Sequence, residues 1–367
     1  MEVRFSLYIC QIYTKREHLR YNMKIQRTAI LITISILLFS CNGIDKSSKS
    51  QTSHYNLLNS KVKTNIDNDL MRQPTDSILH DSLLFYTANG DTTGLWPVKN
   101  QPVPLNGAIL PYNRVVAYYG NLYSKRMGAL GEYPPKEMWE RLNKEVKAWE
   151  VADPKTPVVP AVHYIAVVAQ NDPMSDGKYR MRMPAHQIDS ALNIAKMGDA
   201  IVFLDIQVGL SSVQEEVPLL EKYLSMPQVH LGIDPEFSMK DKSKPGTKIG
   251  TYDAEDINYC SEYLAGLVRK HNLSPKILVV HRFTKGMITN YQNIKLRPEV
   301  QIVINMDGFG PPAIKYSTQD RFIKTEPVQF TGFKLFYKND PKLQPFHMLT
   351  PDELLQLKPR PVYIQYQ

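Results

Sequence analysis

The chain has 367 residues, of which 22% are charged and 43% hydrophobic, and its formal net charge is +8. The first 40 residues contain six Lys or Arg and two acidic residues, so the rest of the chain has a net charge of +4. Because this weak charge is not gathered into basic runs with interleaved aromatic residues, the composition argues against a nucleic-acid partner.

A short targeting signal is predicted near the N-terminus. A basic segment (Met23–Arg27) precedes an apolar run of 11 residues (Ala29–Phe39), which is too short to cross a bilayer as a permanent helix. The run ends in Leu38-Phe39-Ser40-Cys41, and the pattern resembles bacterial lipoprotein signals. The resemblance implies a signal at 23–41, acylation of Cys41, and an exported chain anchored by lipid to the periplasmic or cell-surface face of a bacterial membrane. An ordinary secretory signal with a chance cysteine is the alternative.

The segments on either side of this signal are not expected to belong to the folded core. Residues 1–22 precede the signal and are interpreted as an upstream extension. Residues 42–75 are rich in Ser, Lys, Asn and Asp, and they are predicted to be a disordered tether. Residues 76–111 contain several prolines, and we expect an irregular N-terminal extension that packs on the folded body.

Cysteine usage excludes a disulfide framework. The chain has three cysteines, at positions 10, 41 and 260. With Cys41 acylated and Cys10 lost with the signal, Cys260 is left alone, and no CxxC or Cys/His cluster is present. We therefore expect no internal disulfide and no cofactor.

Residues 112–367 alternate between apolar strand-like and amphipathic helix-like segments. The predicted strands are Arg114–Tyr119, Val158–Val168, Ala200–Ile206, Val229–Asp234, Lys276–His281, Val300–Met306, Gly332–Tyr337 and Pro361–Tyr366. The predicted helices are Pro134–Trp149, Pro184–Met197, Ser211 or Ser212 to Leu224, Asp253–Lys270, a short one at Met287 and Ile288, and Thr350–Leu357. Near-continuous apolar strands indicate burial on both faces, as in parallel sheets.

This alternation predicts an α/β fold, a (β/α)8 TIM barrel over residues 112–367. The segment has 256 residues, close to the roughly 250 that are typical of this fold. A doubly wound open sheet is the alternative, but no Gly-rich phosphate-binding turn follows the first strand.

Two carboxylates at the end of the fourth predicted strand are the leading catalytic candidates. Asp234 and Glu236 are spaced i, i+2, which places both side chains on one side of an extended segment. Two close carboxyl groups do not both ionise easily, so they can divide acid and base roles, as glycoside hydrolysis requires. The alternative is that they cap the next segment or pair with Arg282.

The same segment is similar to the strand end of chitinase-like TIM-barrel enzymes, which carry D-x-D-x-E there. Only Asp234 and Glu236 match, because Gly232 stands at the first acidic position. The likeness implies that Glu236 is the proton donor and that Asp234 orients a substrate acetamido group.

Polar residues follow the other predicted strands as well, and the active sites of TIM barrels lie at this end. The expected substrate-binding residues are Asp205, Gln207, His281, Asn305, Asp307, Tyr118 and Gln365. A divalent metal held by Asp205, Asp234, Glu236, His281 and Asp307 is an alternative, although no HxH pair in the first strand supports it.

Five short segments are together similar to an uncharacterised group of exported bacterial lipoproteins with a TIM-barrel, glycoside-hydrolase-like body: GIDPEF, VVHRF, NMDGFG, FKLFY and VYIQYQ. The likeness spans residues 112–367 and implies the fold and the location. We expect a membrane-anchored glycoside hydrolase acting on a cell-envelope or environmental glycan. The alternatives are an inactive barrel that binds polysaccharide and a metal-dependent hydrolase.

Overall fold

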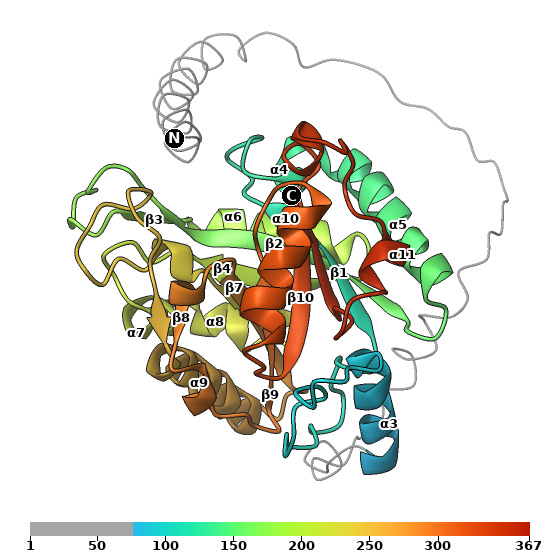
Figure 1. The fold of residues 1–367 in the computed structure, drawn as a ribbon. Coiled ribbons are helices and arrows are strands. Elements are labelled where there is room, and N and C mark those ends of the chain that lie inside the picture. Colours follow the sequence, from blue (N-terminus) through green and yellow to red (C-terminus); the bar gives the residue numbers. More distant parts are fainter. Residues whose placement is uncertain (1–75) are drawn as a thin grey trace, which may run out of the picture.

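The structure is a computed structural model that describes residues 76–367 (Figure 1). The expected upstream extension (1–22), the expected signal with Cys41 (23–41) and the expected tether (42–75) lie outside the described residues. Within those described, no helix combines the length and apolar character needed to cross a membrane.

Eight parallel strands in this part of the chain form a closed barrel, which confirms the predicted (β/α)8 fold. They are β1 (Arg114–Gly120), β2 (Val158–Ala169), β4 (Ile201–Ile206), β5 (Val229–Ile233), β7 (Lys276–Arg282), β9 (Val300–Met306), β10 (Phe330–Leu335) and β11 (Tyr363–Tyr366). Neighbours in the barrel follow chain order, and β1 pairs with both β2 and β11. Closure removes the unpaired edges that an open sheet would expose.

Helices surround the barrel, as Figure 1 shows for α5 and α9. Apolar side chains on their inner faces pack against the outward-facing residues of the strands, and Asp253 and Asp256 form a capping box that starts α9. The elements are α4 (Ala129–Glu132), α5 (Pro135–Ala152), α6 (Ala185–Lys196), α7 (Val213–Glu216), α8 (Glu221–Leu224), α9 (Ala254–His271), α10 (Pro312–Thr318), a π-helix (Gln319–Lys324) and α11 (Pro351–Leu354).

The helix predicted from Ser211 or Ser212 to Leu224 is interrupted at Pro218. It divides into α7, a 3-10 turn (Pro218–Leu220) and α8. Proline has no backbone N–H, so the carbonyl of Gln214 loses its helical donor. The hydroxyl of Tyr259 on α9 donates to that carbonyl instead, at 3.5 Å. The interruption therefore ties α7 to its neighbouring helix.

Other predicted boundaries move by a few residues, and short elements appear that the sequence pattern does not show. The seventh and eighth strands are Phe330–Leu335 and Tyr363–Tyr366, and the helix predicted over 350–357 is α11, which ends at Leu354. The short helix at Met287 is a 3-10 turn (Lys285–Met287), followed by β8 (Ile288–Thr289), which pairs with β6 (Tyr252–Asp253). The new elements also include β3 (Arg180–Arg182), antiparallel to β2, and 3-10 turns at Pro235–Phe237, Tyr291–Asn293 and Asp340–Lys342.

The N-terminal extension contains one helix that the sequence analysis does not predict, α3 (Ser77–Ala88). Asp76 caps it by accepting hydrogen bonds from the backbone N–H groups of Ile78 and Leu79. Its apolar residues lie on several sides, so no amphipathic stripe marks it in the sequence.

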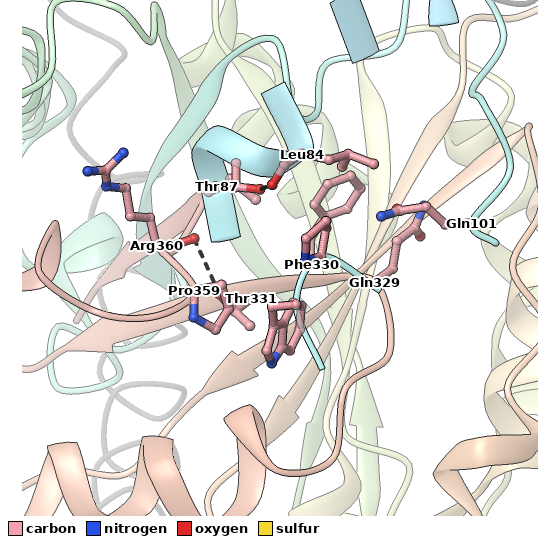
Figure 2. Close-up of a pocket in the computed structure, with 11 residues that line it drawn as sticks. Leu84, Thr87, Gln101, Gln329, Phe330, Thr331, Pro359 and Arg360 are labelled. Carbon is pink, nitrogen blue, oxygen red and sulfur yellow. Dashed lines mark hydrogen bonds between the residues drawn. The ribbon is translucent and has the colours of Figure 1, made fainter. Parts of the chain in front are cut away.

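The extension closes the amino-terminal end of the barrel. Leu84 of α3 and Leu110 pack against residues near the starts of strands, such as Phe203 and Phe330. Figure 2 shows Leu84 and Thr87 of α3 facing a small pocket lined by Phe330 and other residues of this end. Backbone hydrogen bonds reinforce the contact, including one from the N–H of Arg360 to the carbonyl of Thr87 at 2.8 Å.

Candidate active site

Seven barrel strands bring seven polar side chains together inside the barrel, six from near their carboxyl ends and His163 from the middle of β2. We call them the mouth cluster: Tyr119, His163, Asp205, Asp234, His281, Asp307 and Lys334. Side chains alternate along a strand, so these residues share the barrel interior. Asp234 and Asp307 directly follow β5 and β9. Their N–H groups donate to the carbonyls of Ile206 (3.1 Å) and Arg282 (3.0 Å), which holds each aspartate against the neighbouring strand.

Asp205 lies at the centre of the mouth cluster and is fully buried. The hydroxyl of Tyr119 donates to its Oδ2 at 3.0 Å. Its Oδ1 lies 3.6 Å from Nε2 of His163 and 3.6 Å from Nε2 of His281. Burial alone would raise the pKa of Asp205, but His281 and His163 outweigh it and hold the pKa well below its usual range. Asp205 is therefore a buried carboxylate ion.

A chain of ion pairs leads from Asp205 to the rim of the barrel. Nδ1 of His281 lies 2.8 Å from Oδ2 of Asp307, and Nζ of Lys334 lies 2.9 Å from Oδ1 of the same aspartate. Burial lowers the pKa of His281, but Asp205 and Asp307 outweigh it and raise the pKa to about 10. Lys334 also lies over the ring of Tyr119, at 3.9 Å from its centroid. Two cations thus balance two carboxylates inside the barrel.

Asp234 and Glu236 lie on the 3-10 turn that follows β5. Oδ1 of Asp234 accepts the backbone N–H of Glu236 at 3.1 Å, and Nε2 of Gln207 donates to Oδ2 of Asp234 at 3.3 Å. Asp234 is buried, whereas Glu236 is partly exposed and its carboxyl group has no hydrogen-bond partner among residues 76–367.

Both carboxyl groups of this turn hold their protons unusually tightly. Burial raises the pKa of Asp234 to about 7, against the opposing charge of His281. Desolvation, together with the nearby Asp234 and Asp307, raises the pKa of Glu236 to about 8. Acidic groups with raised pKa values therefore stand beside ion-paired carboxylates, which is the division of roles that acid–base catalysis uses.

A second set of polar groups supports the mouth cluster from within the barrel. The hydroxyl of Tyr363 lies 2.6 Å from Nδ1 of His163 and accepts a hydrogen bond from Nε2 of Gln365 at 3.0 Å. Nδ2 of Asn305 donates to Oε1 of Gln365 at 3.4 Å. Burial lowers the pKa of His163 to about 4, so this histidine is neutral. The set fixes the orientation of its ring.

Of the residues predicted to bind substrate, only some reach solvent. Asp307 has an exposed fraction of 9% and Gln207 of 7%. Four others have an exposed fraction of 0%, so their side chains lie below the surface: Asp205, His281, Asn305 and Gln365.

The placement of Tyr118 corrects the prediction that it lines the pocket. Its hydroxyl lies 2.8 Å from that of Tyr337, and its ring packs near Tyr366 in the layer between strands and helices. Tyr119, the next residue, occupies the inward position because side chains alternate along β1. Arg282 does not pair with Asp234 or Glu236, because its guanidinium binds Glu326 and two backbone carbonyls.

Sequence reasoning missed three residues of the site: His163, Lys334 and Tyr363. All three lie inside strands whose apolar neighbours suggest ordinary core positions. A signal was present, since a charged or imidazole group in a strand that is buried on both faces needs a partner. Reading each strand by alternate positions would have placed them on the inner face.

Three buried residues of the mouth cluster have the composition of a metal site: His163, Asp205 and His281. One ligand atom from each lies within 4.8 Å of the other two. Asp205 and His281 belong to the set that the sequence suggests for a metal. Asp234, Glu236 and Asp307 are not part of the group that the structure brings together, and His163 takes their place.

Comparison with known proteins adds no family. No protein-family model matches the chain, and no curated protein sequence matches it.

Proposed function

We propose that the protein is a glycoside hydrolase, anchored by lipid on Cys41, that acts on a cell-envelope or environmental glycan with Glu236 as its general acid. The observation that carries the proposal is the position of Glu236. Its carboxyl group stands at the mouth of the barrel, partly exposed and without a hydrogen-bond partner in residues 76–367. This is the end of a TIM barrel that performs catalysis.

Asp234 acts as the partner of Glu236 in this proposal. It is buried, and its Oδ1 holds the backbone N–H of Glu236, so it fixes the turn that presents the acid. The raised pKa of Glu236, about 8, keeps it protonated at neutral pH and able to donate to a glycosidic oxygen. Asp234 is therefore a positioning residue and is too enclosed to serve as the nucleophile.

Asp307 supplies the second carboxylate that glycoside hydrolysis needs. Its oxygens lie 2.9 Å from Lys334 and 2.8 Å from His281, and these two cations hold it in place. In this proposal Asp307 activates water or stabilises the oxocarbenium-like transition state.

Three phenylalanines support a carbohydrate ligand. Phe237, Phe283 and Phe309 each follow a strand end of the mouth within a few residues, and all three are partly or largely exposed. Phe309 has an exposed fraction of 48% and packs edge-on against Phe336 at 6.0 Å between ring centroids. Aromatic faces beside carboxylates suit a sugar, because its ring presents apolar C–H faces between polar hydroxyls.

The experiment measures release of reducing ends from a panel of α- and β-linked polysaccharides and peptidoglycan glycan strands. Glu236→Gln removes the acid and is expected to lower kcat by about 10²–10⁴-fold, with no loss of melting temperature. Glu255→Gln is the matched control, since Glu255 is an exposed carboxyl at the start of α9. Equal turnover in the two variants on a cleaved substrate would rule out Glu236 as the acid.

A binding-only barrel is the second candidate function, and one observation favours it. Asp205 and Asp307 are engaged in ion pairs, as expected for carboxylates that stabilise a scaffold. This candidate predicts saturable binding of a polysaccharide in the panel without release of reducing ends, and with the same affinity in wild type and Glu236→Gln.

A further inference from the structure

Three buried atoms in the mouth cluster face one another without hydrogen bonds. They are Nε2 of His163, Oδ1 of Asp205 and Nε2 of His281, and none has a hydrogen-bond partner among residues 76–367. All three residues have an exposed fraction of 0%. Buried polar atoms are normally paired, because leaving one unpaired costs about 1–3 kcal/mol. Three such atoms aimed at one point indicate a missing occupant.

The distances around Asp205 are too long for direct hydrogen bonds between its Oδ1 and the two histidines. Each histidine Nε2 lies 3.6 Å from Oδ1 of Asp205. On the opposite side of the same His281 ring, Nδ1 lies much closer to a carboxylate, at 2.8 Å from Oδ2 of Asp307. Charge-assisted contacts of this kind normally close to about 2.7–2.9 Å. A separation of 3.6 Å is instead close to the roughly 3.4 Å between two ligands that are each about 2.1 Å from a tetrahedral zinc ion.

Gly232 on β5 keeps this space free of a side chain. A Cβ atom at this position would lie 2.5 Å from Oδ1 of Asp205 and 2.6 Å from Nε2 of His163. Any other residue would therefore press on two of the three atoms. The chain has a glycine where one strand passes directly beside the unpaired groups.

The outer atoms of the three side chains are held as metal ligands usually are. The ring of His281 contacts a carboxylate through Nδ1, and the ring of His163 contacts the hydroxyl of Tyr363 through Nδ1 at 2.6 Å. The second oxygen of Asp205 accepts the hydroxyl of Tyr119 at 3.0 Å. Such contacts set the tautomer and orientation of first-row metal ligands.

We propose that His163, Asp205 and His281 form a binding site for one divalent first-row transition metal ion, with zinc as the best fit. Two imidazoles and one carboxylate suit zinc, iron or manganese and leave a coordination position for water. His281 must be neutral to bind the ion, so metal binding releases to solvent the proton that its Nε2 otherwise carries. The inference does not depend on glycoside hydrolysis, because it requires only that the ion binds.

The experiment uses the full chain without a histidine tag, stripped with a chelator and dialysed against Zn²⁺ or Co²⁺. Metal content per chain and the visible absorption of bound Co²⁺ are the readouts, and neither needs turnover. Wild type is expected to take up about one ion per chain. His163→Gln should take up none. His230→Gln is the matched control, since His230 is an equally buried barrel histidine whose Nδ1 accepts the N–H of Ile277.

Tyr363→Phe keeps the proposal testable if His163→Gln fails to fold. It keeps the ring but removes the hydroxyl against His163, and it should weaken metal affinity roughly 10–100-fold. If wild type does not take up about one ion per chain, the proposal is overturned, and the space between His163, Asp205 and His281 holds water instead. Equal affinity in wild type and Tyr363→Phe, or in folded His163→Gln, also overturns it. Loss of hydrolysis in Glu236→Gln with full metal content would separate this site from the proposed acid.

Discussion

The two ends of the barrel are built from opposite kinds of residue. At the amino-terminal end, Leu84 and Leu110 of the extension pack on apolar side chains near the starts of strands, such as Phe203. At the carboxyl-terminal end, Asp205, Asp307 and their cationic partners fill the interior with ion pairs. The amino-terminal end is therefore stabilised by apolar burial, whereas the carboxyl-terminal end depends on each buried charge keeping its oppositely charged partner.

The largest expected loss of stability follows from removing one charge at the carboxyl-terminal end. Lys334→Met leaves Asp307 with one cation fewer in a buried site. Breaking a buried ion pair from one side costs about 3–5 kcal/mol, because the remaining charge stays desolvated. Urea unfolding of wild type, Lys334→Met and the double variant Lys334→Met/Asp307→Asn measures the effect. The double variant should recover part of the loss, and equal stability of all three would show that the pair is screened by solvent.

Shortening one buried side chain at the amino-terminal end of the barrel should destabilise the fold without changing metal uptake or turnover. Leu110 has an exposed fraction of 0% and packs in the apolar cluster at the amino-terminal end of the barrel. Leu110→Ala is expected to cost about 2–5 kcal/mol, from lost burial and the cavity left behind. Denaturant unfolding measures the stability. At denaturant concentrations too low to unfold the variant, its metal uptake and turnover should match those of wild type. A change in either would mean that the two ends are coupled.

Replacing glycine by alanine should have opposite effects on stability at a crowded position and at an open position. Gly232→Ala places a Cβ against Asp205 and His163, and overpacking of this kind costs about 1–3 kcal/mol. Gly266→Ala is the control, because the space around Gly266 in α9 is open and alanine favours a helix by about 0.8–1.0 kcal/mol. Thermal unfolding should therefore shift in opposite directions, and a shared direction would contradict the close approach at Gly232.

The smallest expected effect is a change in how stability depends on pH. The folded-state pKa of Glu236, about 8, is above its ordinary value of 4.5. A raised pKa gives stability that is complete below pH 4.5 and is lost as the pH rises through about 8. Glu236→Gln removes this titration, so its unfolding free energy should fall less over that range than that of wild type or Glu255→Gln. The effect is small because Glu236 is partly in solvent, and an unchanged slope would contradict the raised pKa.

The apolar strands made the barrel predictable, but much of its polar interior was not. Strands such as β9 read directly from the sequence because burial on both faces gives continuous apolar runs. His163 and Lys334 lie within such runs, and their partners Asp205 and Asp307 are far away in the chain, so only closure of the barrel shows the pairing. The helix α3 escaped prediction because its apolar residues form no single stripe.

The pairing of β1 with β11 has a consequence for how the chain assembles. Val115 lies in register with Tyr363 and Tyr118 with Tyr366, so the first barrel strand finds one of its two neighbours almost 250 residues later. Contacts this distant in sequence slow folding. Until β11 arrives, a nascent chain leaves β1 and β10 with open hydrogen-bonding edges that other strands can join. Nearly the whole domain must be synthesised before it is protected from aggregation.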